Sequence, residues 1–265
     1  MTTADAPVLM TTDAGVATLT LNRPAAFNSF DSTMKAALLE RLRDVSSDVE
    51  VRAVVITGTG SAFCAGQDLK EHLALVQLGS AAVGNTVTEF YNPMIELLTG
   101  MAKPVIAAIN GVAAGAGAGL ALASDLRIAA RSAVLRTSFS RVGLSADSGL
   151  SFTLPRLIGA GRAKRVMLLD EPIDADTAVA WGAVDQVVDD DQLAAAAATL
   201  AGRLAAGPTG AYAWMKASFA QASDGDLRST LEFENRAQQA CFTSADHAEA
   251  LAAFVAKRPP VFTGR

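Results

Sequence analysis

Two short apolar runs, each followed by a glycine-rich loop and a helix-like pattern, constrain this chain most. The runs are "VRAVVITG", residues 51–58, and "KPVIAAIN", residues 103–110. Continuous apolar, largely β-branched segments of this length are typical of strands buried on both faces of a parallel sheet. Because the unit of strand, loop and helix recurs along the first two-thirds of the chain, the sequence predicts an α/β architecture.

The flanking segments predict further elements. "PVLMTTDAGVATLTLNRP" indicates two strands around a turn at residues 13–15, and "DSTMKAALLERLRDVSSD" indicates a helix capped by Asp31 or Ser32. In the helical pattern "TEFYNPMIELLTGMA", Pro93 is the candidate for the first helical position. After about residue 205 the pattern changes to helices only. We therefore expect a core over residues 1–204 and a helical region over residues 205–265.

Composition limits the kinds of partner. The chain has 265 residues, of which 51% are hydrophobic and 18% are charged, as in a globular protein with a sizeable core. A net charge of −5 without a basic stripe argues against a nucleic-acid partner. The first residues show no signal-peptide pattern, and no apolar run is long enough to cross a bilayer. We expect a cytoplasmic protein without a membrane partner.

The loops that follow the two buried runs are candidates for one binding site. They are "GSAFCAGQDLKE", residues 60–71, and "NGVAAGAGAG", residues 110–119. Ligands of open α/β sheets bind beyond the carboxyl ends of the strands, where helix N-termini offer unpaired N–H groups. One N–H from each loop, converging on one oxygen, would make an oxyanion hole.

Two alternatives compete for the second loop. A dinucleotide fingerprint requires a third glycine, but Leu120 and Leu122 occupy the positions that it would take. The glycines can also serve close helix packing alone, because the absence of Cβ lets backbones approach. The nucleotide interpretation is therefore disfavoured, whereas the packing interpretation stays open.

The same loops carry a family resemblance. "SAFCAGQDLKE" and "KPVIAAINGVAAGAGAGLALASDLRIAA" resemble the two signature blocks of the crotonase (enoyl-CoA hydratase/isomerase) superfamily, and "LNRPAAFNSFD" and "FVAKRPPVFTGR" match it as well. "CAGQDL", "GVAAGAGA" and "VGLSAD" look most like its epoxyphenylacetyl-CoA isomerase subgroup of phenylacetate breakdown. The resemblance implies a spiral of ββα units with a helical C-terminal trimerisation region, homotrimers or dimers of trimers, and an acyl-CoA thioester substrate.

Carried onto this sequence, the resemblance assigns site residues. It makes the backbone N–H groups of Gln67 and Ala116 the oxyanion donors, with the glycines letting the thioester carbonyl lie against bare backbone. The residues that it places along the coenzyme A are Arg23, Ala25, Ala65, Gln67, Asp68 and Leu69, with Phe262 closing over it. Coenzyme A is part of the substrate, and the resemblance implies neither a metal ion nor a separate cofactor.

The carboxylates bear on the reaction. The family's hydratases use two glutamates, and the corresponding positions here hold Gly119 and Phe139, neither of which can carry a proton. Asp147 in "VGLSADSG" matches the catalytic aspartate of the isomerase subgroup, although Ala146 and "SGLSF" depart from the subgroup's usual loop. A buried base with a raised pKa can move a proton from C2 to C4 while the oxyanion hole holds the dienolate. Alternatively, Asp147 caps a helix or shapes a turn.

Three functions remain on this evidence. The leading one is an acyl-CoA isomerase that shifts a double bond or rearranges an epoxide. The second is an enoyl-CoA hydratase, and the third is a catalytically silent acyl-CoA-binding protein. The sequence leaves open the acyl group, whose pocket we expect to be lined by loops such as residues 74–88, and the choice between trimer and hexamer.

Overall fold

The computed structural model describes residues 6–78 and 85–265, and the strands within these residues form two β-sheets. The larger sheet has the order β1-β2-β3-β5-β7-β10, in which only the β1–β2 pair is antiparallel. The smaller sheet has the order β4-β6-β8-β9, with β9 antiparallel to its neighbour. The strands are β1 (Val8–Asp13), β2 (Val16–Leu21), β3 (Ala53–Gly58), β4 (Ala62–Cys64), β5 (Val105–Ile109), β6 (Val112–Ala114), β7 (Leu126–Ala130), β8 (Val134–Arg136), β9 (Ile173–Asp174) and β10 (Gln186–Val188).

The helices complete a repeating unit. They are α1 (Ser32–Ser47), α2 (Leu69–Leu78), α4 (Asn92–Gly100), α5 (Ala116–Ala123), α6 (Leu150–Ile158), α7 (Ala160–Leu169), α8 (Ala175–Trp181), α9 (Leu193–Ala205), α10 (Thr209–Asp224), α11 (Leu227–Phe242) and α12 (Ala245–Val255), with short turns η2 (Pro24–Ala26), η3 (Val87–Tyr91), η4 (Ser140–Val142) and η5 (Asp190–Gln192). β3, β5 and β7 join the larger sheet, and the strands that follow them, β4, β6 and β8, join the smaller one. The predicted α/β class and the spiral of ββα units are therefore confirmed.

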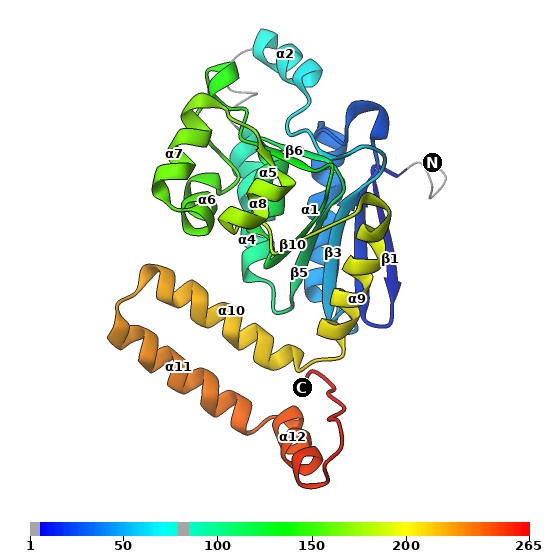
Figure 1. Ribbon diagram of the computed structural model, residues 1–265, viewed down its shortest axis with the longest axis vertical. Helices are drawn as coiled ribbons and strands as arrows, with labels where there is room; N and C mark the ends of the chain where they lie inside the picture. The colour runs from blue at the N-terminus through cyan, green and yellow to red at the C-terminus, as the bar shows by residue number, and fades with distance from the viewer. Residues whose placement is uncertain (1–5, 79–84) are drawn as a thin grey trace.

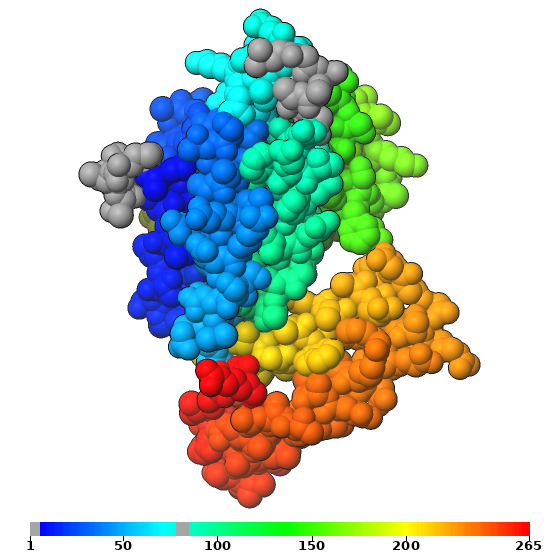
Figure 2. Space-filling view, turned by 180° about the vertical axis from the view of Figure 1, so that it is seen from behind, coloured from blue at the N-terminus to red at the C-terminus, as the bar shows by residue number. Residues whose placement is uncertain are grey.

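Strand β3 buries apolar side chains on both of its faces. Val54 and Ile56 lie in the cluster that contains Leu38 of α1, whereas Val55 lies in the cluster that contains Ala197 of α9. Figures 1 and 2 show α1 and α9 on opposite faces of the larger sheet. The continuous apolar run thus reflects a strand that is covered by a helix on each side.

Local signals near the N-terminus are matched by the structure. β1 and β2 form a hairpin whose two loop residues, Ala14 and Gly15, have φ of 46° and 77°, the positive values that a tight hairpin turn requires. Asp31 is the N-cap of α1, and its carboxylate accepts a 2.8 Å hydrogen bond from the Met34 N–H. Both the turn at residues 13–15 and the cap were predicted.

The expectation that Pro93 begins a helix is wrong. The helix is already formed at η3, a π-helical turn that ends at Tyr91, and it continues directly into α4. The Asn92 N–H bonds to the Val87 carbonyl five residues earlier, which is the wide spacing of a π-turn. Because proline lacks an N–H and crowds the preceding turn, this wider turn accommodates Pro93 without ending the helix.

The two parts expected on either side of residue 204 meet between α9 and α10. α9 ends at Ala205 and packs on the larger sheet, with Ala201 and Ala205 buried. From Thr209 onward, α10, α11 and α12 form a projection at the lower end of the molecule (Figures 1 and 2).

One lysine ties the projecting helices to the core. The Lys216 Nζ of α10 lies 2.7 Å from the Asp125 carboxylate and donates to the carbonyl oxygens of Leu98 and Lys103 at 3.2 and 3.1 Å. Within the described chain, α11 itself buries only Ala237. The position of α10, α11 and α12 against the core therefore depends on hydrogen bonds and an ion pair as much as on apolar packing among these helices.

Arg52 ties the core to the end of the chain. It stands just before β3 and donates from Nε to Thr209 Oγ1 at 3.1 Å, from Nη1 to the Phe262 carbonyl at 3.0 Å, and from Nη2 to the Gly207 carbonyl. Asp246 accepts the N–H groups of residues 263 and 264 at 2.6 and 2.9 Å. The tail is thus held at the end of the sheet where β3 begins.

The expected acyl-pocket loop and the expected lack of a membrane span both concern single segments of the chain. Of the loop 74–88 that was expected to line an acyl pocket, residues 79–84 lie outside the described residues. Among the helices of residues 6–78 and 85–265, none combines the length and the apolar character that crossing a bilayer requires.

Candidate active site

The loops after β4 and β6 lie side by side. β4 pairs in parallel with β6, Cys64 opposite Ala113, so the two loops leave the same edge of the smaller sheet. Gly66, with φ of +86°, sits so close to the second loop that a Cβ on it would lie 2.7 Å from the Ala114 oxygen and 3.5 Å from the Ala116 nitrogen. The structure therefore brings residues 65–67 against the start of α5.

Two N–H groups in these loops have no backbone acceptor. Gln67 lies opposite Phe30 in an isolated parallel β-bridge. The Phe30 N–H donates to the Gly66 carbonyl at 2.7 Å, and the Asp68 N–H donates to the Phe30 carbonyl at 3.0 Å. The N–H of Gln67, which lies between these two residues, therefore faces away from Phe30. Ala116 is the first residue of α5, where N–H groups have no partner inside the helix and the helix dipole favours negative charge. Within the described chain neither N–H donates to another backbone group, and both are available to a ligand oxygen.

The glycines of α5 face protein. A Cβ on Gly117 would collide with the Cys64 carbonyl oxygen, and one on Gly119 would lie 2.5 Å from the Ser148 Cβ and 2.7 Å from its carbonyl oxygen. The expectation that these glycines expose backbone to a thioester is wrong for Gly117 and Gly119. They let α5 close against the β4 strand on one side and against the Asp147 segment on the other.

Asp147 does not cap a helix. Its carboxylate accepts a 2.8 Å hydrogen bond from Ser148 Oγ and none from a backbone N–H of the described chain, and the N-cap of α6 is Gly149. Partial burial raises the pKa of Asp147, against which the Ser148 hydrogen bond acts to lower it. The helix-cap alternative is therefore wrong. The turn alternative is confirmed for the backbone, because the Leu150 N–H donates to the Asp147 carbonyl oxygen at 3.1 Å. The half-buried carboxylate itself is left with one hydroxyl partner.

The Asp147 segment lies next to the oxyanion loops. Ser148 packs on Gly119, which is three residues after Ala116 and hence about 4.5 Å further along α5. A Cβ on Gly149 would lie 3.2 Å from Ile95 of α4, so the segment is held between α4 and α5. The structure thus brings Gln67, Ala116 and Asp147 into one region.

Tyr91 belongs to this region, although the sequence analysis did not identify it. Its hydroxyl donates to Gln67 Oε1, and the residue is only 3% exposed. Burial, and secondarily the charge of Asp147, raise the pKa of Tyr91, so the hydroxyl stays protonated and donates. Its position in "TEFYNP" is the sequence signal that could have identified Tyr91. Tyr91 stands four residues, about one helical turn, before Ile95, and Ile95 packs toward Gly149.

The coenzyme A candidates of the first loop gather around one ion-pair cluster. Arg23 Nη2 lies 3.0 Å from Asp31 and 3.1 Å from Asp68. The Asp68 carboxylate also accepts the N–H groups of residues 70 and 71 and so caps α2. Partial burial opposes the shift, but the backbone hydrogen bond from Glu71 and the Arg23 guanidinium lower the pKa of Asp68.

The remaining candidates divide into two groups. Ala25 and Leu69 are exposed near this cluster, and the Ala65 N–H donates to the Phe27 carbonyl at 3.0 Å. Phe262 is not brought together with them. Its carbonyl is bound by Arg52 at the amino end of β3, whereas the oxyanion loops follow the carboxyl ends of β4 and β6.

Neither of the two positions that correspond to the hydratase glutamates carries a side chain that could replace a carboxylate. Gly119 is filled by Ser148, and Phe139 is buried in the main hydrophobic cluster. Within residues 6–78 and 85–265, no group of three His, Cys, Asp or Glu side chains is placed to hold a metal ion.

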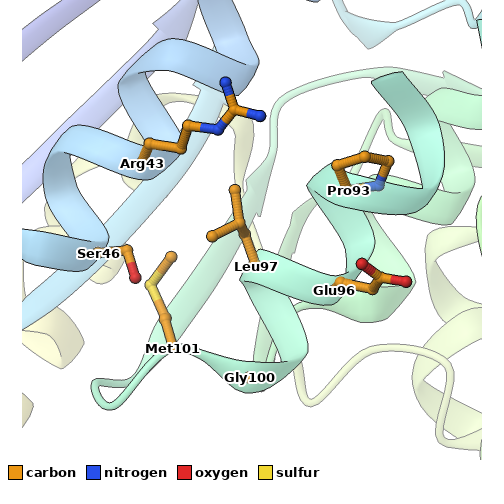
Figure 3. Close-up of a pocket in the computed structure, with 7 residues that line it drawn as sticks. All are labelled: Arg43, Ser46, Pro93, Glu96, Leu97, Gly100 and Met101. Carbon is orange, nitrogen blue, oxygen red and sulfur yellow. The ribbon is translucent and has the colours of Figure 1, made fainter. Parts of the chain in front are cut away.

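A surface groove between α1 and α4 is separate from this region. Figure 3 shows part of its lining, in which Leu97 of α4 points toward Arg43 and Ser46 of α1. None of its lining residues belongs to the oxyanion loops or to the Asp147 segment. We assign the chemistry to the region around Asp147.

Comparison with known proteins identifies the family. The enoyl-CoA hydratase/isomerase family model matches residues 11–265. The chain belongs to this family. It is 44% identical to the 1,2-epoxyphenylacetyl-CoA isomerase of Escherichia coli (strain K12), over 97% of this chain and 98% of that protein.

Hydratases of the family are also similar to it. The chain is 33% identical to the short-chain-enoyl-CoA hydratase of Clostridium acetobutylicum, over 95% of each protein. It superposes on the crystal structure of an enoyl-CoA hydratase from Bacillus anthracis with a TM-score of 0.93 at 33% identity, covering 98% of this chain and all of that one. The family predicted from the sequence is confirmed, and the chain is an enzyme of the enoyl-CoA hydratase/isomerase family.

Proposed function

We propose that this enzyme is an acyl-CoA isomerase with Asp147 as its single base and the N–H groups of Gln67 and Ala116 as its oxyanion hole. The observation that carries the proposal is the Asp147 carboxylate, which is half-buried, has a raised pKa and caps no helix. The positions of the two hydratase glutamates, filled here by Gly119 and Phe139, favour a reaction that needs one carboxylate over one that positions a water.

One carboxylate suffices for a double-bond shift. Asp147 takes the C2 proton of a 3-enoyl thioester, and the electron pair moves into a dienolate whose oxygen accepts the two N–H groups. The neutral carboxylic acid then returns the same proton to C4, which leaves the double bond between C2 and C3. Its raised pKa suits both steps, because the group must bind the proton and release it again.

The substrate class follows from the relative and the chemistry together. The Escherichia coli relative is named for a ring epoxide of phenylacetyl-CoA, and we include an epoxide rearrangement of such an acyl group in the proposal. Neither reaction changes the overall oxidation state. We therefore propose that coenzyme A enters as part of the substrate and that no separate cofactor takes part.

We also propose a homotrimer or a dimer of trimers assembled through the projecting helices. Several large apolar side chains there are exposed: Phe219 of α10, Leu227, Leu231 and Phe242 of α11, and Phe254 and Val255 of α12. Exposed apolar surface of this extent favours burial against another copy of the chain. Light scattering coupled to gel filtration measures the mass, and a monomer would contradict the proposal.

The direct test of the reaction follows the absorbance of the conjugated enoyl thioester after mixing a 3-enoyl-CoA with wild type or Asp147→Asn. We expect a rise with wild type and a rate about 10²- to 10⁴-fold lower with the variant. Acyl-CoA binding, measured by calorimetry, should persist in the variant. The exposed Asp191→Asn is the matched control and should keep wild-type rates.

Other outcomes would identify the competing functions. If wild type converts a 2-enoyl-CoA to the 3-hydroxyacyl thioester faster than it isomerises a 3-enoyl-CoA, the enzyme is a hydratase. If it binds acyl-CoA but turns over neither enoyl thioester nor a ring-epoxide acyl-CoA, it is a silent binder.

A further inference from the structure

The side chain of Ser148 touches the proposed base and is itself buried. Ser148 is 2% exposed, and its hydroxyl donates to Oδ1 of Asp147 at 2.8 Å. Within the described chain this hydroxyl donates to no other acceptor. Because a buried hydroxyl that gave up the bond would be left unpaired, the direction of the hydrogen bond is fixed.

The backbone at Ser148 has a conformation that glycine adopts more easily. Its φ is +51°, in the left-handed region that is unfavourable for a residue with a Cβ. Backbone strain of this kind collects at functional sites. What serine supplies here and glycine would not is a Cβ that packs on Gly119 of α5 and a hydroxyl that holds the Asp147 carboxylate.

The hydrogen bond makes the two carboxylate oxygens of Asp147 unequal. Oδ1 accepts the Ser148 hydroxyl, whereas Oδ2 has no hydrogen-bond partner in the part of the chain that the structure describes. A protonated oxygen of a neutral carboxylic acid is a donor, so the oxygen that accepts from Ser148 is the carbonyl oxygen and the proton belongs to Oδ2. A proton on Oδ1 would turn the Ser148 hydroxyl away from its acceptor.

We infer that Ser148 is a positioning residue that keeps the proton of neutral Asp147 on Oδ2 and stops the carboxyl group from turning, so that the proton taken from C2 returns to C4 without exchanging with solvent. The C2–H bond breaks as the Oδ2–H bond forms, and its electron pair passes into the dienolate. The Oδ2–H bond then breaks as the C4–H bond forms, which restores the carboxylate. The inference rests on the proposed function, because it assigns a partner to the same base.

An infrared measurement without turnover tests which oxygen holds the proton. The carbonyl stretching band of neutral Asp147 is the band of the acid-minus-neutral difference spectrum that Asp147→Asn removes. A hydrogen bond to a carbonyl oxygen lowers this frequency, so Ser148→Ala and Ser148→Gly should raise it. Ser148→Gly suits the left-handed backbone and provides the test if the alanine variant does not fold. The exposed Ser145→Ala is the matched control and should leave the band in place.

The second measurement is the isotope content of the initial product formed from a 3-enoyl-CoA in deuterium oxide. The wild-type product should carry at C4 the protium that came from C2. Ser148→Ala should incorporate about fivefold more deuterium there, which is the factor that one hydrogen bond of ordinary strength contributes. Because each product molecule reports one completed turnover, a loss of folded enzyme does not change this ratio.

The two measurements separate positioning from packing. A merely structural role of Ser148 would lower stability and rate but leave the band and the isotope ratio at their wild-type values, which overturns the inference. A wild-type product with solvent deuterium at C4 overturns it as well. A failure of the proposed function has a different result, since wild type would then not isomerise the 3-enoyl-CoA while the infrared band still reports whether Ser148 holds Oδ1.

Discussion

The two halves of the candidate site are built differently. The oxyanion half consists of main-chain groups in loops that glycine packing draws together, with Cys64 fully buried and Ala116 only 5% exposed. The base half depends on one side chain, Asp147, carried by a segment in which residues 141–145 are exposed. Under the proposed function, the oxyanion half would resist substitution of side chains, because it consists of main-chain groups, whereas the base half could change through a single loop.

The largest effect is expected from breaking the oxyanion half. Gly117→Ala places a Cβ against the Cys64 carbonyl oxygen, and because this oxygen and the Cα that carries the new Cβ are both backbone atoms, neither can move aside. We expect the free energy of unfolding in urea to fall by about 3 kcal/mol. Gly202→Ala in α9, which has no atom within 4 Å of the new Cβ, is the control and should gain about 0.5–1 kcal/mol. Equal losses in both variants would contradict the packing argument.

A change in the base half should alter the pH dependence of kcat/KM. Ser148→Ala removes the hydroxyl that donates to Asp147 but keeps the Cβ that packs on Gly119. Since this hydrogen bond favours the ionised carboxylate, its loss raises the pKa of Asp147 further. The acid limb of kcat/KM should move to higher pH by about one unit. The exposed Ser151→Ala should leave the profile in place, and a shift to lower pH in Ser148→Ala would refute the assignment of the base.

A smaller effect is expected in stability. Burial raises the folded-state pKa of Asp147 above its unfolded value, so the protonated form favours folding at low pH and the advantage is lost as pH rises through the folded pKa. Asp147→Asn removes a partly buried charge at neutral pH and should raise Tm there by a few degrees, with no gain below about pH 4. Thermal unfolding at both pH values measures this, and a lower Tm at neutral pH would argue for a structural role.

The smallest effect is a difference in thiol reactivity. Burial raises the pKa of the Cys64 thiol to about 12, and the side chain is inaccessible, so a thiol reagent at pH 8 should label Cys241 alone in the folded enzyme. Unfolding in urea should expose both. Cys241→Ser should show no labelling until it unfolds, and labelling of Cys64 in that folded variant would mean that the oxyanion half opens in solution.

Local sequence patterns were sufficient to predict much of the fold. The apolar runs of β3 and β5 indicate strands that are buried on both faces of the sheet. Asp31 indicates the start of α1, because its carboxylate accepts the capping hydrogen bond. The meeting of the two loops followed from the rule that parallel strands end at one edge. These features depend on neighbours close in sequence or on general rules of topology.

The misses concern contacts that no local pattern encodes. The π-turn at residues 87–91 absorbs Pro93, because a proline that breaks an ideal helix fits a wider turn. Gly119 faces Ser148 and Tyr91 faces Gln67, and each pair joins residues more than twenty positions apart. Within the single chain the Phe262 carbonyl is bound by Arg52 at the amino end of β3, so the contact between Phe262 and the coenzyme A stays a prediction.

Arg52 has a consequence for how the protein is made. Its three hydrogen-bond acceptors lie 155, 157 and 210 residues further along the chain. During synthesis the start of β3 therefore leaves the ribosome long before any group that satisfies this guanidinium exists. The nascent core must keep Arg52 hydrated until residues 207–262 have emerged. The Arg52 guanidinium is therefore satisfied only after the helical region has been made.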